Sequence, residues 1–109
     1  MTIQVDEEMI EQVLINLLKN AIEALDNKAN AKIELVGKYS DNAVIIEVAD
    51  NGSGIIKEAL NRIFVPFFTT KKTGSGIGLA LSRQIMQLHN ALITVTSEPE
   101  VKTVFTLKF

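Results

Sequence analysis

Apolar residues between positions 6 and 25 recur every three to four residues, and no proline or glycine interrupts them. This spacing puts them on one face of a helix and predicts an amphipathic α-helix over residues 6–25. Asp6 is a typical N-cap residue, and the pair Asp26 and Asn27 is a typical stop signal. We therefore expect the chain to open with one long helix that buries its apolar side.

Four later stretches carry the β-branched, alternating patterns of strands. Residues 31–38 and 42–50 are separated by a short polar segment, and residues 91–97 and 102–109 are separated by a segment that contains proline. Two strand patterns joined by so few residues predict an antiparallel hairpin in each case.

The stretch between these hairpins predicts two further helices. Residues 56–64 fit a short helix that Pro66 closes, and residues 67–76 have no periodicity and are expected to form a mobile loop. A second amphipathic helix is predicted over residues 76–89. Its expected apolar stripe consists of Ile77, Leu81, Ile85 and Leu88.

Helices and hairpins in this order predict an α+β domain. We expect a two-layer α/β sandwich in which a mixed, largely antiparallel sheet carries about three helices on one face. At 109 residues, 47% of them hydrophobic, the chain is long enough for one core and too short for two. Residues 1–109 are therefore treated as one domain.

Composition narrows the function classes. The formal net charge of −2 gives no basic field, so no nucleic-acid partner is expected. The apolar runs are far shorter than the roughly 18 residues of a membrane span, so no membrane contact is expected from this segment. The chain has no cysteine, which excludes disulfides and thiolate metal sites and fits a reducing compartment. We expect a cytoplasmic domain, whether or not a parent protein is anchored in a membrane.

Glycine occupies every second position from Gly74 through Gly76 to Gly78, at the start of the second predicted amphipathic helix. Glycine amides can approach a ligand closely, and the unpaired N–H groups at a helix start attract anions, phosphates above all. Lys71 and Lys72 precede the glycines as candidate charge partners for phosphate oxygens. The spacing matches neither the dinucleotide-binding motif nor a Walker loop. The alternative is a solvent-exposed glycine loop with an ordinary helix cap.

The motif "DNGSG" at residues 50–54 follows a predicted strand. Gly52 and Gly54 allow a sharp turn and a close approach to a flat ligand, and Asp50 offers a carboxylate that only accepts hydrogen bonds. A carboxylate that faces an exocyclic amine would select adenine over guanine. The alternative is a simple Asp-Asn-Gly turn.

Two asparagines lie on or beside the apolar face of the first predicted helix. At about 100° per residue, Asn20 falls inside the apolar arc and Asn16 falls at its edge. An asparagine is costly to bury without a partner, but its carbonyl oxygen is a hard ligand that suits Mg²⁺. The alternative is an amide that pairs with a neighbouring backbone group.

The order of these motifs resembles the ATP-binding catalytic domain of sensor histidine kinases. This domain belongs to a wider ATPase group that includes type II topoisomerases and mismatch-repair ATPases. "QVLINLLKNAIEAL" is similar to the N box, "DNGSGI" to the first glycine box, "IFVPFFTTK" to the F box and "GSGIGLAL" to the second glycine box. The likeness covers nearly the whole chain.

The resemblance implies a role for each motif. Asn20 would be the Mg²⁺ ligand, Asn16 a second polar contact near the phosphates, and Asp50 the acceptor for the adenine amino group. Thr103 would support the adenine end, and the second glycine box would belong to a lid over the triphosphate. The residues implied for the ATP site are Asn16, Asn20, Asp50, Gly52, Gly54, Ile55, Lys71, Lys72, Gly74, Ser75, Gly76, Ile77, Gly78, Leu79 and Thr103.

The residue one turn before the metal asparagine separates two enzyme classes. In the hydrolytic relatives this residue is a glutamate that activates water, whereas here it is Asn16, which cannot act as a base at neutral pH. The resemblance therefore implies transfer of the γ-phosphate of Mg²⁺-bound ATP to a histidine on a separate dimerisation domain, followed by transfer to a response regulator receiver domain. A non-catalytic nucleotide-sensing module and a serine-directed relative of the anti-sigma-factor kinases are the alternatives.

The chain departs from the family pattern in three places. Glu23 stands where many members have a basic residue. The usual His-Gly-Gly before the penultimate strand reads His-Asn-Ala at residues 89–91, and Lys102 replaces the glycine before Thr103. Family members also have helix and strand material before the segment that this chain matches. We therefore expect the chain to be an N-terminally truncated catalytic domain.

Overall fold

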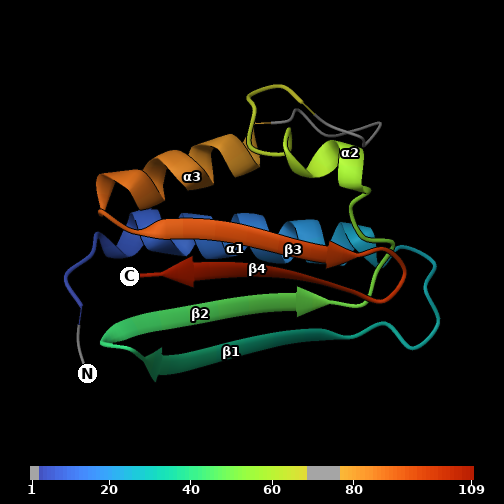
Figure 1. Cartoon of the computed structure of the whole chain (residues 1–109), viewed down its shortest axis with the longest axis horizontal. Helices are drawn as coiled ribbons and strands as arrows, with labels where there is room; N and C mark the ends of the chain where they lie inside the picture. The colour runs from blue at the N-terminus through green and yellow to red at the C-terminus, as the bar shows by residue number, and fades with distance from the viewer. Residues whose placement is uncertain (1–2, 69–76) are drawn as a thin grey trace.

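The computed structural model describes residues 3–68 and 77–109. Its elements form two layers, with the helices on one side of an open sheet (Figure 1). In chain order they are α1 Glu7–Ala24, β1 Ile33–Ser40, β2 Ala43–Asp50, α2 Lys57–Leu60, α3 Gly78–Leu88, β3 Leu92–Glu98 and β4 Lys102–Lys108. The predicted α/β sandwich is confirmed.

The strand order in the sheet is β1-β2-β4-β3. We expected a mixed, largely antiparallel sheet, but every strand pairing in the described part of the chain is antiparallel. Strands β2 and β3 run in the same direction, and β4 lies between them and pairs with both. The chain therefore crosses over the sheet through the helices without forming a parallel pair.

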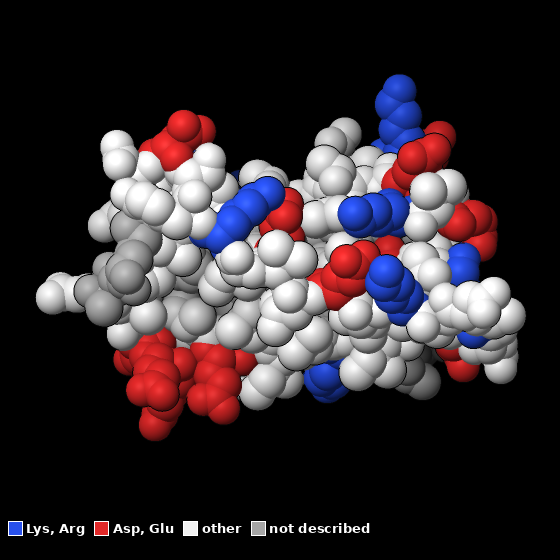
Figure 2. Space-filling model, turned by 90° about the horizontal axis from the view of Figure 1, so that it is seen from below, with Lys and Arg blue, Asp and Glu red and all other residues white. Residues whose placement is uncertain are grey.

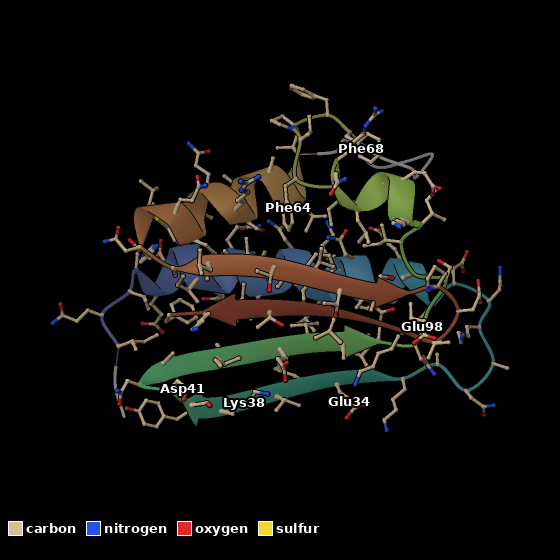
Figure 3. The ribbon with its side chains drawn as sticks, viewed as in Figure 1. Glu34, Lys38, Asp41, Phe64, Phe68 and Glu98 are labelled. Atoms are coloured by element: carbon tan, nitrogen blue, oxygen red, sulfur yellow. The ribbon has the colours of Figure 1, made fainter. Side chains whose placement is uncertain are left out.

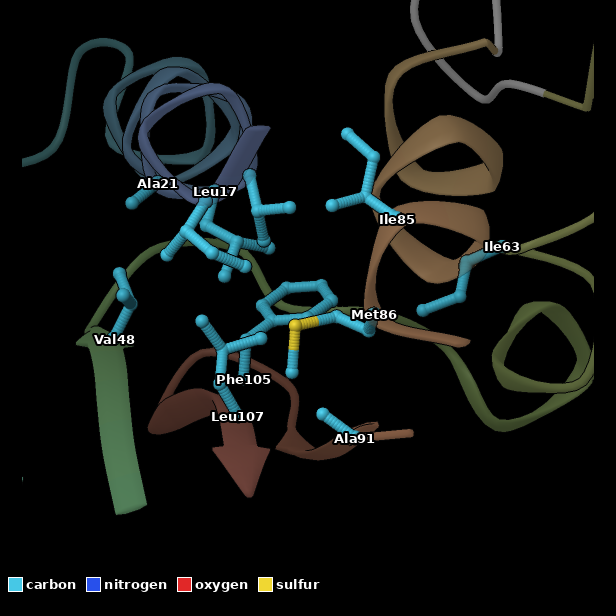
Figure 4. Close-up of a cluster of buried hydrophobic side chains, with 11 residues drawn as sticks. Leu17, Ala21, Val48, Ile63, Ile85, Met86, Ala91, Phe105 and Leu107 are labelled. Atoms are coloured by element: carbon cyan, nitrogen blue, oxygen red, sulfur yellow. The ribbon is translucent and has the colours of Figure 1, made fainter. Parts of the chain in front are cut away.

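Helix α1 agrees with the sequence pattern at both ends. The Asp6 carboxylate accepts a hydrogen bond of 3.0 Å from the Met9 N–H and so caps the helix, whose first turn carries two glutamates that suit its dipole. The inner face of α1 packs on β2 and β4, with α3 alongside (Figure 4). The side chains buried in this core come from Ile10, Val13, Leu17, Ala21, Val48, Ile63, Ile85, Met86, Ala91, Phe105 and Leu107.

The expected apolar stripe of α3 is confirmed at Ile85 and wrong at its other three positions. Ile77, Leu81 and Leu88 are 44%, 40% and 67% exposed, and the buried side chains of this helix are Ser82, Ile85 and Met86. The buried face is turned from the expected one because α3 approaches α1 through small residues near its start. A serine at this contact admits the close approach that a leucine would prevent.

The short predicted helix over residues 56–64 is also shorter than expected. Helix α2 covers only Lys57–Leu60 and continues as tight turns, in which the Arg62 N–H donates to Ala59 O at 2.8 Å. These turns carry Phe64, labelled in Figure 3. Its ring packs edge-on against Phe105 and lies under the Arg83 guanidinium of α3. The segment after α2 therefore anchors α3 to the core.

Strand β1 forms one edge of the sheet. Lys38 on this strand pairs with Glu47 on β2 at 3.2 Å, and Glu34 lies 3.7 Å from Lys32. From below, the side on which β1 lies, acidic and basic side chains are mixed over much of the surface, and acidic ones gather at the lower left (Figure 2). Charged side chains on an edge strand discourage edge-to-edge association. No helix in the described ranges is both long and apolar enough to cross a bilayer.

Candidate functional site

The carboxylate of Asp50 lies at the end of β2 and is 5% exposed. Its Oδ1 accepts a hydrogen bond of 2.9 Å from the Gly52 N–H, which closes an Asx-type turn. The side chain is therefore held in place by the loop that follows it. The predicted turn and the predicted ligand carboxylate are parts of one arrangement.

Gly52 is pressed against the C-terminal end of α1. A Cβ at this position would lie 2.3 Å from the carbonyl oxygen of Ala24, a distance that no side chain can occupy. The next residue strengthens the contact, because the Ser53 N–H donates to the same oxygen at 3.1 Å. The "DNGSG" loop is thus attached to the helix that carries both asparagines.

Gly54 meets the turn between β3 and β4. Its φ is +80°, and a Cβ would lie 2.8 Å from Pro99 Cα and 3.0 Å from Ser97 Oγ. A non-glycine residue would therefore be strained by its backbone conformation as well as by the contact. The loop is held between α1 on one side and the β3–β4 turn on the other.

A second anchor of this loop is Asn51, which the sequence analysis did not single out. Its Oδ1 accepts from the Lys32 N–H at 2.8 Å, and its Nδ2 donates to Asn30 O at 2.9 Å. Both bonds join the loop to the segment before β1. The backbone around Asp50 is consequently fixed before any ligand arrives.

Thr103 lies beside Asp50 on the neighbouring strand. The two residues are register partners on β4 and β2, and Thr103 is 3% exposed. Its hydroxyl lies 2.8 Å from Ser97 Oγ on β3, which also accepts from the Ile55 N–H at 2.9 Å. The structure thus brings together three strand ends and the first glycine box, as expected for Asp50, Gly52, Gly54, Ile55 and Thr103.

Sequence reasoning missed Ser97. On β3, Ile93, Val95 and Ser97 share the parity that faces the helices, and the first two pack on the core. A lone hydroxyl on the apolar parity of a strand needs a buried partner. That exception to the pattern was the signal that could have found it.

The second half of the site lies where α1 meets α3. The Asn16 Nδ2 donates to Gly78 O and to Ser82 Oγ, both at 3.2 Å, and its Oδ1 accepts from the Gln12 Nε2 at 3.1 Å. The sequence predicted a polar Asn16 close to the second glycine box, and the structure brings Asn16 and Gly78 into contact. It also gives the amide a structural bond with a backbone carbonyl, which was the alternative interpretation.

Asn20 lies one turn further along α1 and is half-buried. It stands between Asn16, which contacts α3, and Ala24, which contacts the "DNGSG" loop. No group of three or more histidine, cysteine or acidic residues that could hold a metal occurs in residues 3–68 and 77–109. The donor set fits a Mg²⁺ ion that takes one amide oxygen from the protein and its other ligands from phosphates and water.

Several predicted site residues cannot be placed. Lys71, Lys72, Gly74, Ser75 and Gly76 lie outside the described residues. The residues on either side of Gly78 are described. Ile77 is the N-cap of α3, and Leu79 packs against the core. The predicted lid over the triphosphate therefore stays a prediction.

The comparisons with known proteins bear on this arrangement. The family described as histidine kinase-, DNA gyrase B- and HSP90-like ATPase matches residues 5–109. The chain belongs to this family. It is 43% identical over 105 residues to the signal transduction histidine-protein kinase AtoS of Escherichia coli, and 38% identical over 104 residues to sporulation kinase A of Bacillus subtilis. These matches cover 96% and 95% of the chain but only 17% of either relative.

Solved structures agree with the sequence relatives. The catalytic domain of histidine kinase ThkA superposes with a TM-score of 0.84 at 35% identity, covering 98% of this chain and 69% of that one. Full-length ShkA in complex with AMPPNP superposes with a TM-score of 0.82 at 27% identity, covering 94% of this chain and 21% of that one. The fold is therefore that of histidine kinase catalytic domains.

Proposed function

We propose that this domain binds Mg²⁺-ATP and donates the γ-phosphate to a histidine on a separate dimerisation domain, from which a response regulator receives it. The observation that carries the proposal is the buried, anchored Asp50 at one end of the site, with Asn20 and Asn16 placed along α1 and Gly78 at the start of α3, in contact with Asn16. Family membership and the ShkA complex with AMPPNP, an ATP analogue, support it.

The Asp50 end would recognise the base. A carboxylate accepts a hydrogen bond from the exocyclic amine of adenine, whereas guanine presents a carbonyl at that place and is repelled. Burial strengthens this choice, because a mismatched polar pair away from water has no compensating partner. The hydroxyls of Ser97 and Thr103 add polar contacts on the same wall.

The other end would hold the phosphates. Mg²⁺, when bound there, would neutralise phosphate charge. The amide oxygen of Asn20 would be its protein ligand, and the start of α3 would direct unpaired backbone N–H groups at the anion. Lys71 and Lys72 are the proposed charge partners, in place of the basic residue that Glu23 replaces.

Two features favour transfer over hydrolysis. Asn16 offers no base for water, and its amide is engaged with Gly78 and Ser82. The only histidine of the chain, His89, accepts from the Asp6 N–H through Nε2 at 3.0 Å, so its Nδ1 carries the proton and donates to Ile85 O at 2.8 Å. The Nε2 bond joins the end of α3 to the N-cap of α1, and the Nδ1 bond lies within α3. Since both ring nitrogens are engaged, we infer that the phosphoacceptor lies on another domain.

Nucleotide binding is tested with a fluorescent ATP analogue, with and without Mg²⁺. In Asp50→Asn the retained oxygen can still accept from Gly52, but an NH₂ group replaces the second carboxylate oxygen and repels the adenine amine. We expect affinity to fall at least about tenfold, the loss typical of a reversed charged hydrogen bond. The matched control is Asp41→Asn, in the exposed β1–β2 turn, where φ is 52° and asparagine is well tolerated. Equal affinity of Asp50→Asn and wild type contradicts the adenine assignment.

Phosphoryl transfer is tested by adding a histidine-bearing dimerisation domain from a relative together with ATP labelled on the γ-phosphate. Acid-labile label on that histidine supports the proposal. Acid-stable label on serine would indicate a serine-directed kinase instead. Nucleotide binding without label on any acceptor would indicate a nucleotide-sensing module.

A further inference from the structure

Ser82 is a buried polar residue that the proposed function does not use. It is 0% exposed, although it lies within the first turns of α3 and close to the second glycine box. Its hydroxyl donates to Gly78 O at 2.9 Å and accepts from the Asn16 Nδ2 at 3.2 Å. The hydroxyl, the amide and the carbonyl thus form a closed ring of three hydrogen bonds.

The geometry of this ring leaves Asn16 able to serve a ligand as well. Gly78 O and Ser82 Oγ lie only 2.9 Å apart and are equally far from the Asn16 Nδ2. One N–H of the amide can therefore point between both acceptors, so that its second N–H points in another direction. A structural role for Asn16 and a contact with phosphate are compatible.

The ring lies at the start of α3 and holds a backbone carbonyl there. The N-cap residue Ile77 makes no side-chain capping bond, and the first N–H groups of any helix lack partners inside it. Serine bonds to the carbonyl four residues earlier bend and reposition helices, and here the same carbonyl is also held by α1. The position of the first turn of α3 is thus set from α1, one turn away from Asn20.

We propose that Ser82 is a positioning residue for the triphosphate: by holding Asn16 and Gly78 together, it fixes the start of α3 relative to the metal-binding asparagine. This inference rests on the proposed function. Arg83, its neighbour, lies with its guanidinium carbon 5.8 Å from the centre of the Phe64 ring, a contact of α3 that does not involve Ser82. Removal of the hydroxyl therefore loosens the start of the helix without releasing the rest of it.

The first experiment needs no nucleotide. Amide hydrogen exchange is measured by NMR on wild type, on Ser82→Ala and on Gln84→Ala, an exposed control on the same helix. We expect Ser82→Ala to accelerate exchange in the first two turns of α3 about fivefold to tenfold, the effect of one lost hydrogen bond, and to leave the last turn unchanged. In the double variant Asn16→Ala/Ser82→Ala the effect should be smaller than the sum of the two single effects, since both changes break the bond between the two side chains. Unchanged exchange in Ser82→Ala overturns the link, that is, the proposal that Ser82 ties the start of α3 to α1.

The second experiment compares affinities for an ATP analogue and for adenosine in wild type, Ser82→Ala and Gln84→Ala. Ser82→Ala should weaken the ATP analogue about threefold to tenfold and leave adenosine within about twofold, because only the triphosphate reaches α3. A residue with a merely structural role would change both ligands alike or neither, and that result overturns the positioning role. If the wild type binds no ATP analogue, the proposed function and the positioning role both fail, while the exchange result still decides whether the link exists.

Discussion

The two ends of the proposed site are built in opposite ways. At the Asp50 end, glycines are required because backbone atoms of other segments occupy the space, as with Gly52 against Ala24 O at 2.3 Å. At the α1–α3 end, the atoms of the described residues nearest to a Cβ on Gly78 belong to the Asn16 side chain, at an ordinary contact distance of 3.7 Å. The base end is fixed by the backbone, and the phosphate end is adjusted by side chains. We therefore expect substitutions at the first end to act on stability and those at the second to act on binding.

Gly52→Ala should have the largest effect. The new methyl group overlaps the Ala24 carbonyl, so either the loop or the end of α1 must move, and the bond from the Ser53 N–H is lost with it. We expect the free energy of unfolding to fall by about 3 kcal/mol or more, as for other backbone overlaps that cannot relax. Urea denaturation measures the change.

The matched control is Gly37→Ala on β1, where a Cβ meets nothing within 4 Å. Alanine there should be neutral or stabilise by up to about 1 kcal/mol, since glycine weakens a strand interior. Equal stability of the two variants would contradict the view that the base end is fixed by packing.

Gly54→Ala should have the next largest effect. The left-handed φ costs an alanine about 1–2 kcal/mol, and the contact with Pro99 adds to this, although Pro99 is exposed and can shift. We expect a loss of stability smaller than that of Gly52→Ala, together with weaker ATP binding because Ser97 is displaced. Thermal denaturation and analogue titration on the same sample separate the two effects, and a loss larger than that of Gly52→Ala would count against this ranking.

Asn20→Ala tests the other end. Because the side chain is half-buried on a helix and alanine is the best helix former, stability should change by less than about 1 kcal/mol. Analogue affinity should fall about tenfold in the presence of Mg²⁺ and little in its absence, as expected for loss of one metal ligand. If the loss is the same with and without Mg²⁺, Asn20 is not the metal ligand.

Gly78→Ala should have the smallest effect. Its methyl group finds space beside Asn16, and alanine favours a helix over glycine by up to about 1 kcal/mol. Stability should be equal or slightly higher, with ATP affinity within about threefold of wild type. A large loss of stability, measured by urea denaturation, would mean that both ends are equally crowded.

The sequence predicted the parts of this fold that depend on periodicity and failed where close packing decides. Helix α1 matches its pattern because large apolar residues make its contacts. The predicted buried face of α3 was correct at Ile85 and wrong elsewhere. The reason is that the contact with α1 is made by Ser82, a residue that a hydrophobic pattern counts as polar.

In the candidate site, the sequence identified residues that share one short motif and missed those that only the fold brings together. Asp50 and Gly52 could be predicted because a short motif contains the turn, the carboxylate and the glycine together. Ser97 was not found, because its partners Ile55 and Thr103 lie on other segments of the chain and only the sheet register brings them near. Nothing in the described residues tests the lysines before the second glycine box.

The length of helix α1 also sets the distance between the two ends of the proposed site. The eight steps along the helix from Asn16 to Ala24 separate its two contacts by about 12 Å along the axis, with Asn20 halfway between them. One inserted residue between Asn16 and Asn20 would rotate everything after it by about 100°, and four would restore the rotation but lengthen the spacing by about 6 Å. The distance between the two ends of a ligand that this domain can hold is therefore encoded in the residue count of a single helix.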